Sequence, residues 1–454
     1  MKPADNYKQE TIIYYYNREL PEGFKISQVT SGGYVAQKLL TNTARDDLPT
    51  ELIIKNVGDF NGDRISDYII STVLAHGNAG QIDLMFGRAY NTFILNPLPV
   101  NDIDKGIVLT GQAGEMLGFA TSAVYDFNQD GLADLIVSSP GIDNKSGKIS
   151  VYFGNHFGLI DSNPFGFSVY GAVIASLFGY SVAELSNKFY STQFKGILIG
   201  APGDCGGNVG ALYIIYKSDN LPSTFYANDI VSSGYGEKIC GTNIGDFLGT
   251  SVSAGDFNGD GQVDVIVGAP GYNNAGACYL FLGKNGNFGI TNLSNLHPSQ
   301  GIVFRGTNHG DLTGFSVVNL GDINGDGIDD AAIGSPGYNG NIGKISVILG
   351  STNISGSDLN ALPNSKGFTI YGVDLSGGLG SSVQHIGDVN NDGYNDIFIS
   401  ADRSGNGWYI YGNHTLSDIH LDRLLVTQGK ALSNTYNGID LDFQVALLGL
   451  AVEL

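Results

Sequence analysis

Acidic and amide side chains recur in this chain in a nine-residue pattern that suits a hard metal cation. Five segments carry Asp at position 1, Asn at position 3 and Asp at positions 5 and 9. Ca²⁺ takes about six to eight oxygen ligands, and a tight loop can supply them from alternate positions, with a backbone carbonyl at position 7. The sequence therefore predicts up to five Ca²⁺ ions as cofactors. The candidate ligands are Asp59, Asn61, Asp63, Ile65, Asp67, Asp126, Asn128, Asp130, Leu132, Asp134, Asp256, Asn258, Asp260, Gln262, Asp264, Asp322, Asn324, Asp326, Ile328, Asp330, Asp388, Asn390, Asp392, Tyr394 and Asp396.

Position 6 of the pattern needs a sharp turn that glycine adopts most easily. Four copies have glycine there, and the first has Arg64. We therefore expect the first site to be distorted or weaker than the others.

An EF-hand loop begins with a similar pattern but needs a bidentate Glu at position 12 and flanking helices. Position 12 is apolar in every copy and lies in a run typical of a buried strand. The residues are Ile70, Val137, Val267, Ile333 and Ile399. The sequence therefore excludes EF-hands in favour of metal loops between strands.

The loops are spaced as a long repeat. The first Asp of each loop follows the previous one by 67, 130, 66 and 66 residues. The double interval hides a copy whose flanks, Gly179–Val182 and Gly196–Pro202, match the other repeats. Residues 186–195 of that copy lack the acidic side chains, so we expect no Ca²⁺ there. A repeat of this length over 454 residues predicts seven copies.

Each repeat reads as four short strands separated by Gly, Pro and Asn turns. In the fourth calcium-loop copy these are Gly314–Gly321, Ala331–Gly334, Gly343–Gly350 and Gly367–Gly372. The expected fold is all-β: one domain over residues 1–454, a seven-bladed β-propeller with four-stranded antiparallel blades. A parallel β-solenoid is the rival, although its repeats are usually shorter.

The chain ends suggest how such a ring would close. Thr11–Tyr16 and Gly23–Ser27 resemble third and fourth strands, and Val445–Val452 resembles a first strand. We expect the last blade to be shared by the N- and C-terminal segments, which would remove exposed sheet edges.

The repeats resemble FG-GAP repeats, which build the propeller of integrin α subunits. The resemblance rests on Leu117-Gly118-Phe119, Phe247-Leu248-Gly249 and Thr313-Gly314-Phe315, with Gly200-Ala201-Pro202 and Gly268-Ala269-Pro270. Ser139-Pro140 and Ser335-Pro336 depart from that pattern, and Ser400-Ala401-Asp402 lacks the proline. The resemblance implies a protein-binding module, and five calcium loops suggest a distant or microbial relative.

Composition limits the partners. The formal charge is −21, but the five loops supply 15 candidate Asp ligands, and five Ca²⁺ ions would offset much of this charge. Nucleic acid is therefore not an expected partner. No apolar run is long enough for a transmembrane helix, and the first residues lack a signal-peptide core. We expect an extracellular or cell-surface protein, or a secreted bacterial protein delivered to a host.

Cysteines and glycosylation motifs decide little. Cys205, Cys240 and Cys278 are odd in number, so at least one is free unless an intermolecular disulfide forms. Asn-x-Ser/Thr motifs begin at Asn144, Asn292, Asn353 and Asn413, and such short motifs also arise by chance.

Catalytic signals are weak, so we expect no enzyme. A Gly-x-Ser pattern at Ser181, Ser251, Ser316 and Ser382 recurs once per repeat, which indicates a strand position rather than a nucleophile. Gly147-Lys148 resembles the end of a phosphate-binding loop, but Gly141 lies one residue too far from Gly147 for that motif. The seven histidines show no metal-binding spacing.

The leading hypothesis is a calcium-stabilised module that binds a protein in adhesion or host contact. The alternative is a propeller that binds carbohydrate, or one that hydrolyses carbohydrate or phospholipid. In such a blade the loops joining strands 2–3, and each blade to the next, lie opposite the calcium loops. Variable loops on a rigid scaffold often carry function, and integrin α propellers bind partners on this side. The residues predicted to contact a partner are Tyr272, His309, Tyr338 and Arg403.

Overall fold

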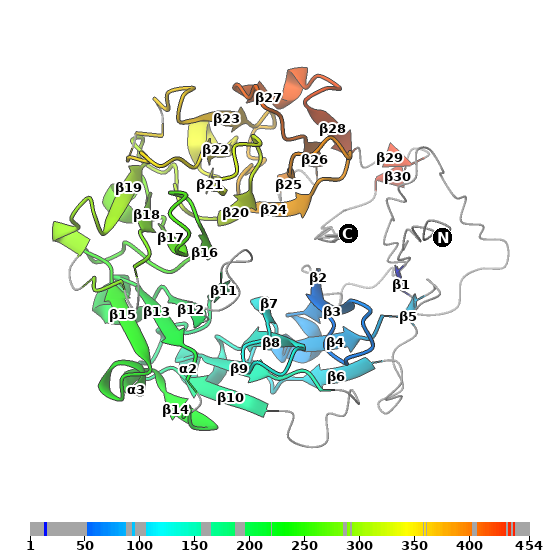
Figure 1. The fold of residues 1–454 in the computed structure, drawn as a ribbon, viewed down its shortest axis with the longest axis vertical. Helices are drawn as coiled ribbons and strands as arrows, with labels where there is room; N and C mark the ends of the chain where they lie inside the picture. Colours follow the sequence, from blue (N-terminus) through cyan, green and yellow to red (C-terminus); the bar gives the residue numbers. More distant parts are fainter. Residues whose placement is uncertain are drawn as a thin grey trace, which may run out of the picture.

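The computed structural model shows an all-β protein whose antiparallel sheets are arranged as a ring (Figure 1). It describes residues 13–15, 52–87, 93–95, 106–155, 165–186, 196–218, 220–284, 288–290, 293–356, 358–359, 361–401, 406–432, 435–436 and 439–440. Within these residues, six four-stranded blades surround a common axis. The first strand of each blade lies innermost and the fourth lies outermost.

The strands of the first three blades follow each other in chain order. Blade 1 contains β2 (Leu52–Gly58), β3 (Asp67–Thr72), β4 (Gln81–Met85) and β6 (Gly106–Thr110). Blade 2 contains β7 (Thr121–Tyr125), β8 (Ala133–Ser138), β9 (Lys148–Tyr152) and β10 (Phe165–Tyr170). Blade 3 contains β11 (Ser181–Leu185), β12 (Gly196–Ala201), β13 (Ala211–Tyr216) and β15 (Gly236–Cys240). Blade 3 is the copy without acidic loop residues, so its presence as a blade is confirmed.

The other three blades repeat this order. Blade 4 contains β16 (Val252–Gly255), β17 (Asp264–Ala269), β18 (Ala277–Phe281) and β19 (Gly301–Arg305). Blade 5 contains β20 (Val317–Gly321), β21 (Asp330–Ser335), β22 (Lys344–Ile348) and β23 (Gly367–Tyr371), as predicted. Blade 6 contains β24 (Ser382–Gly387), β25 (Asp396–Ala401), β26 (Asn406–Ile410) and β28 (Gly429–Leu432).

Shorter elements lie in the connections. Between strands 2 and 3 are α1 (Ala75–Asn78), α2 (Ile142–Lys145), η1 (Asp204–Asn208), η2 (Tyr272–Asn274) and α4 (Tyr338–Asn341). Between strands 3 and 4 are β5 (Phe93–Leu95), β14 (Thr224–Tyr226), α3 (Ala227–Ser232), η3 (Leu293–Asn295), β27 (Ile419–His420) and η4 (Leu421–Arg423). β14 and β27 pair in parallel with the outermost strands β10 and β23 of the preceding blades, which covers two exposed edges.

The predicted number of seven blades is wrong, because the described residues form six. Dividing the chain length by the repeat assumes that both ends belong to repeats. Instead, β1 (Ile13–Tyr15) pairs in parallel with β5, and β29 (Thr435–Tyr436) pairs with β30 (Ile439–Asp440), each in a separate two-stranded sheet. The segments Gly23–Ser27 and Val445–Val452, predicted to share a last blade, lie outside the described residues.

The hydrophobic core lies between neighbouring blades. The second strands of the inner blades, such as β17, are buried along their whole length because a blade packs on each of their faces (Figure 1). One cluster joins Phe167 and Ile149 of blade 2 to Ile199 and Tyr213 of blade 3, and similar clusters fill the next junctions. This burial on both faces explains why the second strands read as continuous apolar runs.

Paired glycines let adjacent blades approach closely. Gly268 and Gly314 meet across the junction of blades 4 and 5, and a Cβ on Gly268 would lie 1.8 Å from the Gly314 carbonyl oxygen. The same approach joins Gly200 to Gly249 and Gly334 to Gly380. Gly314 has φ of 84°, a conformation that side chains disfavour. These close approaches explain why both the Phe-Gly half and the Gly-Ala-Pro half of the repeat motif contain glycine.

The repeated serines join the same blades. Hydroxyl groups of Ser181, Ser251 and Ser316 donate to the carbonyls of Gly249, Gly314 and Gly380 at 2.9, 2.9 and 2.7 Å. Each serine therefore has a structural partner in the next blade, as expected for a recurring strand position.

Candidate metal loops and a candidate partner-binding face

Each acidic loop joins the first and second strands of its blade and is closed by its own carboxylates. In the loop of blade 5, Asp322 accepts hydrogen bonds from the backbone of Gly325, Asp326 and Gly327 at 2.6, 3.1 and 2.7 Å. Asp326 accepts from the backbone of Ile328 at 2.9 Å. The alternating polar residues therefore point into one tight turn.

The last Asp of each loop is the most buried. All five lie at the start of second strands, as the first residue or, for Asp134, the second, and all are 0% exposed: Asp67, Asp134, Asp264, Asp330 and Asp396. The Asp330 carboxylate accepts from the backbone of Ile323 at 2.9 Å and of Gly350 at 2.7 Å. These bonds position the group at the base of the loop, beneath the other polar side chains.

Burial without a neighbouring cation raises the pKa of these buried carboxyls. The pKa rises to about 8 for Asp264 and Asp330, about 7 for Asp67 and Asp134, and about 6 for Asp396. Backbone hydrogen bonds oppose this shift, whereas the charge of the Asp at position 5 adds to it in every loop. The carboxyls of positions 5 and 9 are thus close enough to repel each other, and a cation between them would relieve that repulsion.

The asparagine at position 3 faces the carboxylate of position 5. Its amide donates to the carboxylate at position 5 in all five loops, at 2.9 to 3.2 Å. In the described part of the chain, no three His, Cys, Asp or Glu side chains gather as a metal site. The loops nevertheless fit a calcium ion in chemistry, because each offers carboxylate, amide and carbonyl oxygens around a buried carboxyl at position 9 and an exposed carboxyl at position 5 that repel each other.

The loops also hold the next blade in place. The carbonyls of Asp59 and Phe60 in blade 1 accept from Ala133 and Asn155 of blade 2, both at 2.9 Å. Asp256 and Phe257 accept from Asp329 and Ser351 at 3.2 and 3.0 Å, and Asp322 and Ile323 accept from Asn395 and Asn413 at 3.3 and 3.1 Å. An ion that orders a loop would therefore also order a junction between blades.

The expected distortion of the first loop is not seen. Arg64 has φ of 68°, close to the glycines at the same position, and its backbone donates to Asp59 at 2.8 Å, as Gly261 does to Asp256. Whether this site binds more weakly stays a prediction. Arg64 costs free energy of folding because its left-handed backbone conformation is unfavourable for a residue other than glycine.

The second loop departs from the others instead. Tyr125 precedes its first Asp, where the other loops have Gly58, Gly255, Gly321 and Gly387, and Asp126 itself has φ of 54°. The sequence indicates this difference, because it has no glycine before Asp126.

Position 4 also has positive φ in every loop, a constraint that the ligand pattern does not reveal. Gly325 there lies beneath Tyr394 of the next loop, whose ring would be 2.5 Å from an added Cβ. The acid-poor segment of blade 3 lies outside the described residues from 187 to 195.

The opposite face carries exposed apolar side chains. Because strands alternate in direction, the connections between blades lie at the other end from the acidic loops. After the outermost strand, each of these connections forms a tight turn with a backbone hydrogen bond. The turns span residues 112–115, 173–176, 243–246, 308–311 and 374–377, and we call them together the turn face.

The second residue of these turns is often a large aliphatic. Ile174, Ile244 and Leu375 are 71%, 82% and 85% exposed, and the equivalent positions hold Ala113 and His309. Turn tips usually favour Gly, Pro, Asn, Asp or Ser. More than half of the exposed large apolar residues in the described chain lie on this side. They are Leu74, Val173, Ile174, Ile244, Phe247, Leu312, Phe315, Val373 and Leu375.

The residues predicted to contact a partner are placed differently from one another. His309 is exposed at its turn tip on this face. Tyr272 and Tyr338 are half-buried, with Tyr272 packed edge-on against Tyr279 and Tyr338 beside Tyr371 and Lys344. Arg403 lies outside the described residues. Partner binding by these four residues stays a prediction.

Two of the three cysteines form a disulfide. Cys205 of η1 is bonded to Cys240 at the end of β15, with their Cα atoms 6.1 Å apart, whereas Cys278 is free and buried. A disulfide is typical of proteins from oxidising compartments. Within the described residues, no helix has the length and apolar character to cross a membrane.

Comparison with known proteins agrees with the repeat architecture. The FG-GAP repeat family matches residues 118–152, 248–281 and 313–348, each of which spans the first three strands of a blade. Integrin α-8 of mouse is 30% identical over 240 residues, covering 50% of this chain and 20% of integrin α-8. Among fruit-fly relatives, integrin α-PS3 is 32% identical over 192 residues, covering 40% of this chain and 15% of its own length.

Integrin α-PS5 of fruit fly is 26% identical over 342 residues, 71% of this chain and 30% of its own length. The matched region thus spans a third or less of these relatives. All of them are integrin α subunits rather than enzymes, which supports the expectation of a binding protein. The chain therefore contains FG-GAP repeats, folds as a β-propeller and is similar to integrin α subunits.

Proposed function

We propose that this chain is a calcium-stabilised β-propeller that binds a protein partner outside cells or at a cell surface. The observation that carries the proposal is the set of exposed aliphatic side chains at the tips of the turn face. Solvent-exposed apolar groups on a rigid scaffold favour binding to an apolar protein surface.

Ca²⁺ would act on the scaffold rather than on the partner. In each loop, Asp at positions 1, 5 and 9, Asn at position 3 and the carbonyl at position 7 would hold the ion. Because three of these loops also accept hydrogen bonds from the next blade, an ion there would stiffen the ring that displays the turn face. The similarity to integrin α subunits supports both parts of the proposal.

The test compares two matched variants of the full chain. Ile174→Ser, Ile244→Ser and Leu375→Ser together remove the exposed aliphatic tips of the turn face. Leu425→Ser and Val426→Ser remove equally exposed side chains between β26 and β28, on the side of the acidic loops. Wild-type protein immobilised with Ca²⁺ would first be used to capture partners from cell-surface extracts, followed by identification by mass spectrometry.

The first variant should lose at least tenfold in affinity for the captured partner, a change of about 1.4 kcal/mol. The second variant should bind like wild type. Equal binding by both variants would move the site away from the turn face. Binding of the wild-type protein to glycans on an array, together with no captured protein partner, would favour the carbohydrate-binding alternative.

A further inference from the structure

The disulfide of blade 3 joins η1 to the end of β15, the strand that leads into one turn of the turn face. Residues 207–210, which end η1 and lead into β13, accept hydrogen bonds from the turn that carries Ile244. Their carbonyls accept from Gly245, Phe247, Leu248 and Gly241 at 3.1, 3.1, 3.2 and 2.9 Å. A Cβ on Gly207 would lie 3.1 Å from the Ile244 side chain, so the two residues are in contact. The position of this tip therefore depends on the path of η1.

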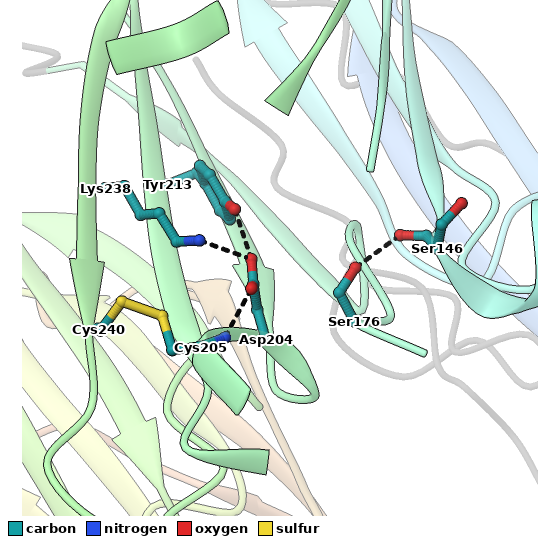
Figure 2. Close-up of polar contacts among 7 residues, drawn as sticks. All are labelled: Ser146, Ser176, Asp204, Cys205, Tyr213, Lys238 and Cys240. Carbon is teal, nitrogen blue, oxygen red and sulfur yellow. Dashed lines mark hydrogen bonds and ion pairs between the residues drawn. A yellow bond between two sulfur atoms is a disulfide. The ribbon is translucent and has the colours of Figure 1, made fainter. Parts of the chain in front are cut away.

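The path of η1 is held by a small group of side chains (Figure 2). Asp204 is almost fully buried; its carboxylate forms an ion pair with Lys238 at 3.0 Å and accepts a hydrogen bond from the Tyr213 hydroxyl. Lys238 also lies over the Tyr213 ring at 4.9 Å. The Asp204 carbonyl accepts from Gly210 at 3.0 Å and closes the loop.

The disulfide holds the side of η1 that faces β15. Cys205 has φ of 59°, a left-handed backbone that is costly for a residue other than glycine unless its surroundings impose it. The bond ties Cys205 to the last residue of the strand that leads into the turn. Cys240 is exposed and Cys205 is half-buried, so a reductant can reach the bond.

Blade 5 offers a natural comparison. There the carbonyls of Asn341 and Ile342 accept from Gly378 and Leu379 at 2.8 and 3.1 Å, so α4 supports the Leu375 turn in the same way. α4 contains no cysteine.

We propose that the Cys205–Cys240 disulfide is a redox-sensitive latch that fixes η1 and the Ile244 turn in the conformation used for partner binding. Its consequence for binding rests on the proposed function, but its effect on the loops does not. A dithiol would act as the reductant. Its thiolate attacks Sγ of Cys240 and breaks the disulfide, and the Cys205 thiolate that leaves takes up a proton.

The second thiol of the reductant then attacks the mixed disulfide and releases Cys240 as a thiol. The protein gains two electrons and two protons, and the dithiol becomes a disulfide. With the bond open, η1 is held by Asp204 and the hydrogen bonds alone.

Hydrogen exchange measured by mass spectrometry on the full chain, with and without dithiothreitol, tests the latch. Amide exchange should accelerate about tenfold or more in residues 204–210 and 241–249, as expected for local opening. Residues 338–343 and 373–380 of the comparison site, and strands β17 and β18, should be unchanged. The variant Cys205→Ala with Cys240→Ala should match the reduced protein and respond no further to dithiothreitol.

Unchanged exchange in residues 204–210 and 241–249 would overturn the proposal. Equal acceleration at both sites would also overturn it, since that result indicates general loosening rather than a latch. Both readouts are independent of any partner. A failed turn-face variant test would therefore refute the proposed function while leaving the latch itself intact.

Discussion

Replacement of Asp330 by Asn separates the role of the acidic loops in metal binding from their role in the fold. Asp330 is fully buried and accepts backbone hydrogen bonds from Ile323 and Gly350. Burial raises the pKa of its carboxyl to about 8, so at pH 7 the calcium-free protein holds this group mostly protonated. A protonated carboxyl and an amide have nearly the same shape, but the amide nitrogen only donates, so Asn can accept only one of the two backbone hydrogen bonds that Asp330 accepts.

The expected cost of Asp330→Asn therefore depends on Ca²⁺. In a chelator the substitution should lower the free energy of unfolding by about 1 to 3 kcal/mol, the scale of one buried backbone N–H left without its acceptor. With Ca²⁺ at about 100 times its dissociation constant, an intact site adds about 2.7 kcal/mol. Loss of that contribution should make Asp330→Asn more costly with Ca²⁺ than with chelator by about 2 to 3 kcal/mol.

Urea unfolding at pH 7, followed by circular dichroism with Ca²⁺ or with chelator, measures the difference. The matched control is Asp246→Asn, because Asp246 is also buried but accepts its hydrogen bonds from Thr242 and Asn243 on the turn face. Its cost, about 1 to 3 kcal/mol, should be the same in both conditions. If Asp330→Asn is equally costly in both, Asp330 has a structural role and is no calcium ligand.

Two further predictions concern pH and the blade junctions. The buried loop carboxyls have folded pKa values of about 6 to 8, above the ordinary value of 3.8, so the folded state binds more protons than the unfolded state from 3.8 up to these folded values. The calcium-free protein should be most stable at acid pH and lose stability as the pH rises from 5 to 8, whereas the stabilisation by Ca²⁺ should grow over the same range. Melting temperatures measured in chelator and in Ca²⁺ across this range check both trends. A melting temperature in chelator that does not change with pH would refute the predicted loss of stability. Ser251→Ala and Ser316→Ala should each cost about 1 kcal/mol, because each leaves a glycine carbonyl of the next blade without its hydroxyl donor. Urea unfolding should give the same cost with or without Ca²⁺, and no loss in either variant would remove these serines as blade contacts.

The sequence predicted most of the blade architecture because each signal was local. Turn residues and apolar runs placed the strands of blade 5, and the spacing revealed blade 3 although its loop residues 186–195 have no acid. The paired glycines gave the repeat its recognisable motif because two backbones meet there. The number of blades was not local information, since it depends on what the chain ends pair with.

Features formed by residues far apart in the chain also could not be predicted from the sequence. The Cys205–Cys240 pair depends on β13 and β15 lying side by side, with Ala211 opposite Cys240. Tyr272 resembled an exposed contact residue, but a neighbouring ring, Tyr279, partly covers it. In the sequence, Ile244 is one apolar residue in a loop. Only the structure shows that its turn lies on the same face as the other turns between blades.

The central claim, a propeller stabilised by Ca²⁺ at its acidic loops, is tested most directly by counting bound ions. Native mass spectrometry of the full chain during a Ca²⁺ titration should show up to five ions bound, with the site of Arg64 filled last. Asp330→Asn should bind one ion fewer than wild type. A chain that binds no Ca²⁺ and unfolds identically in Ca²⁺ and in chelator would contradict the account.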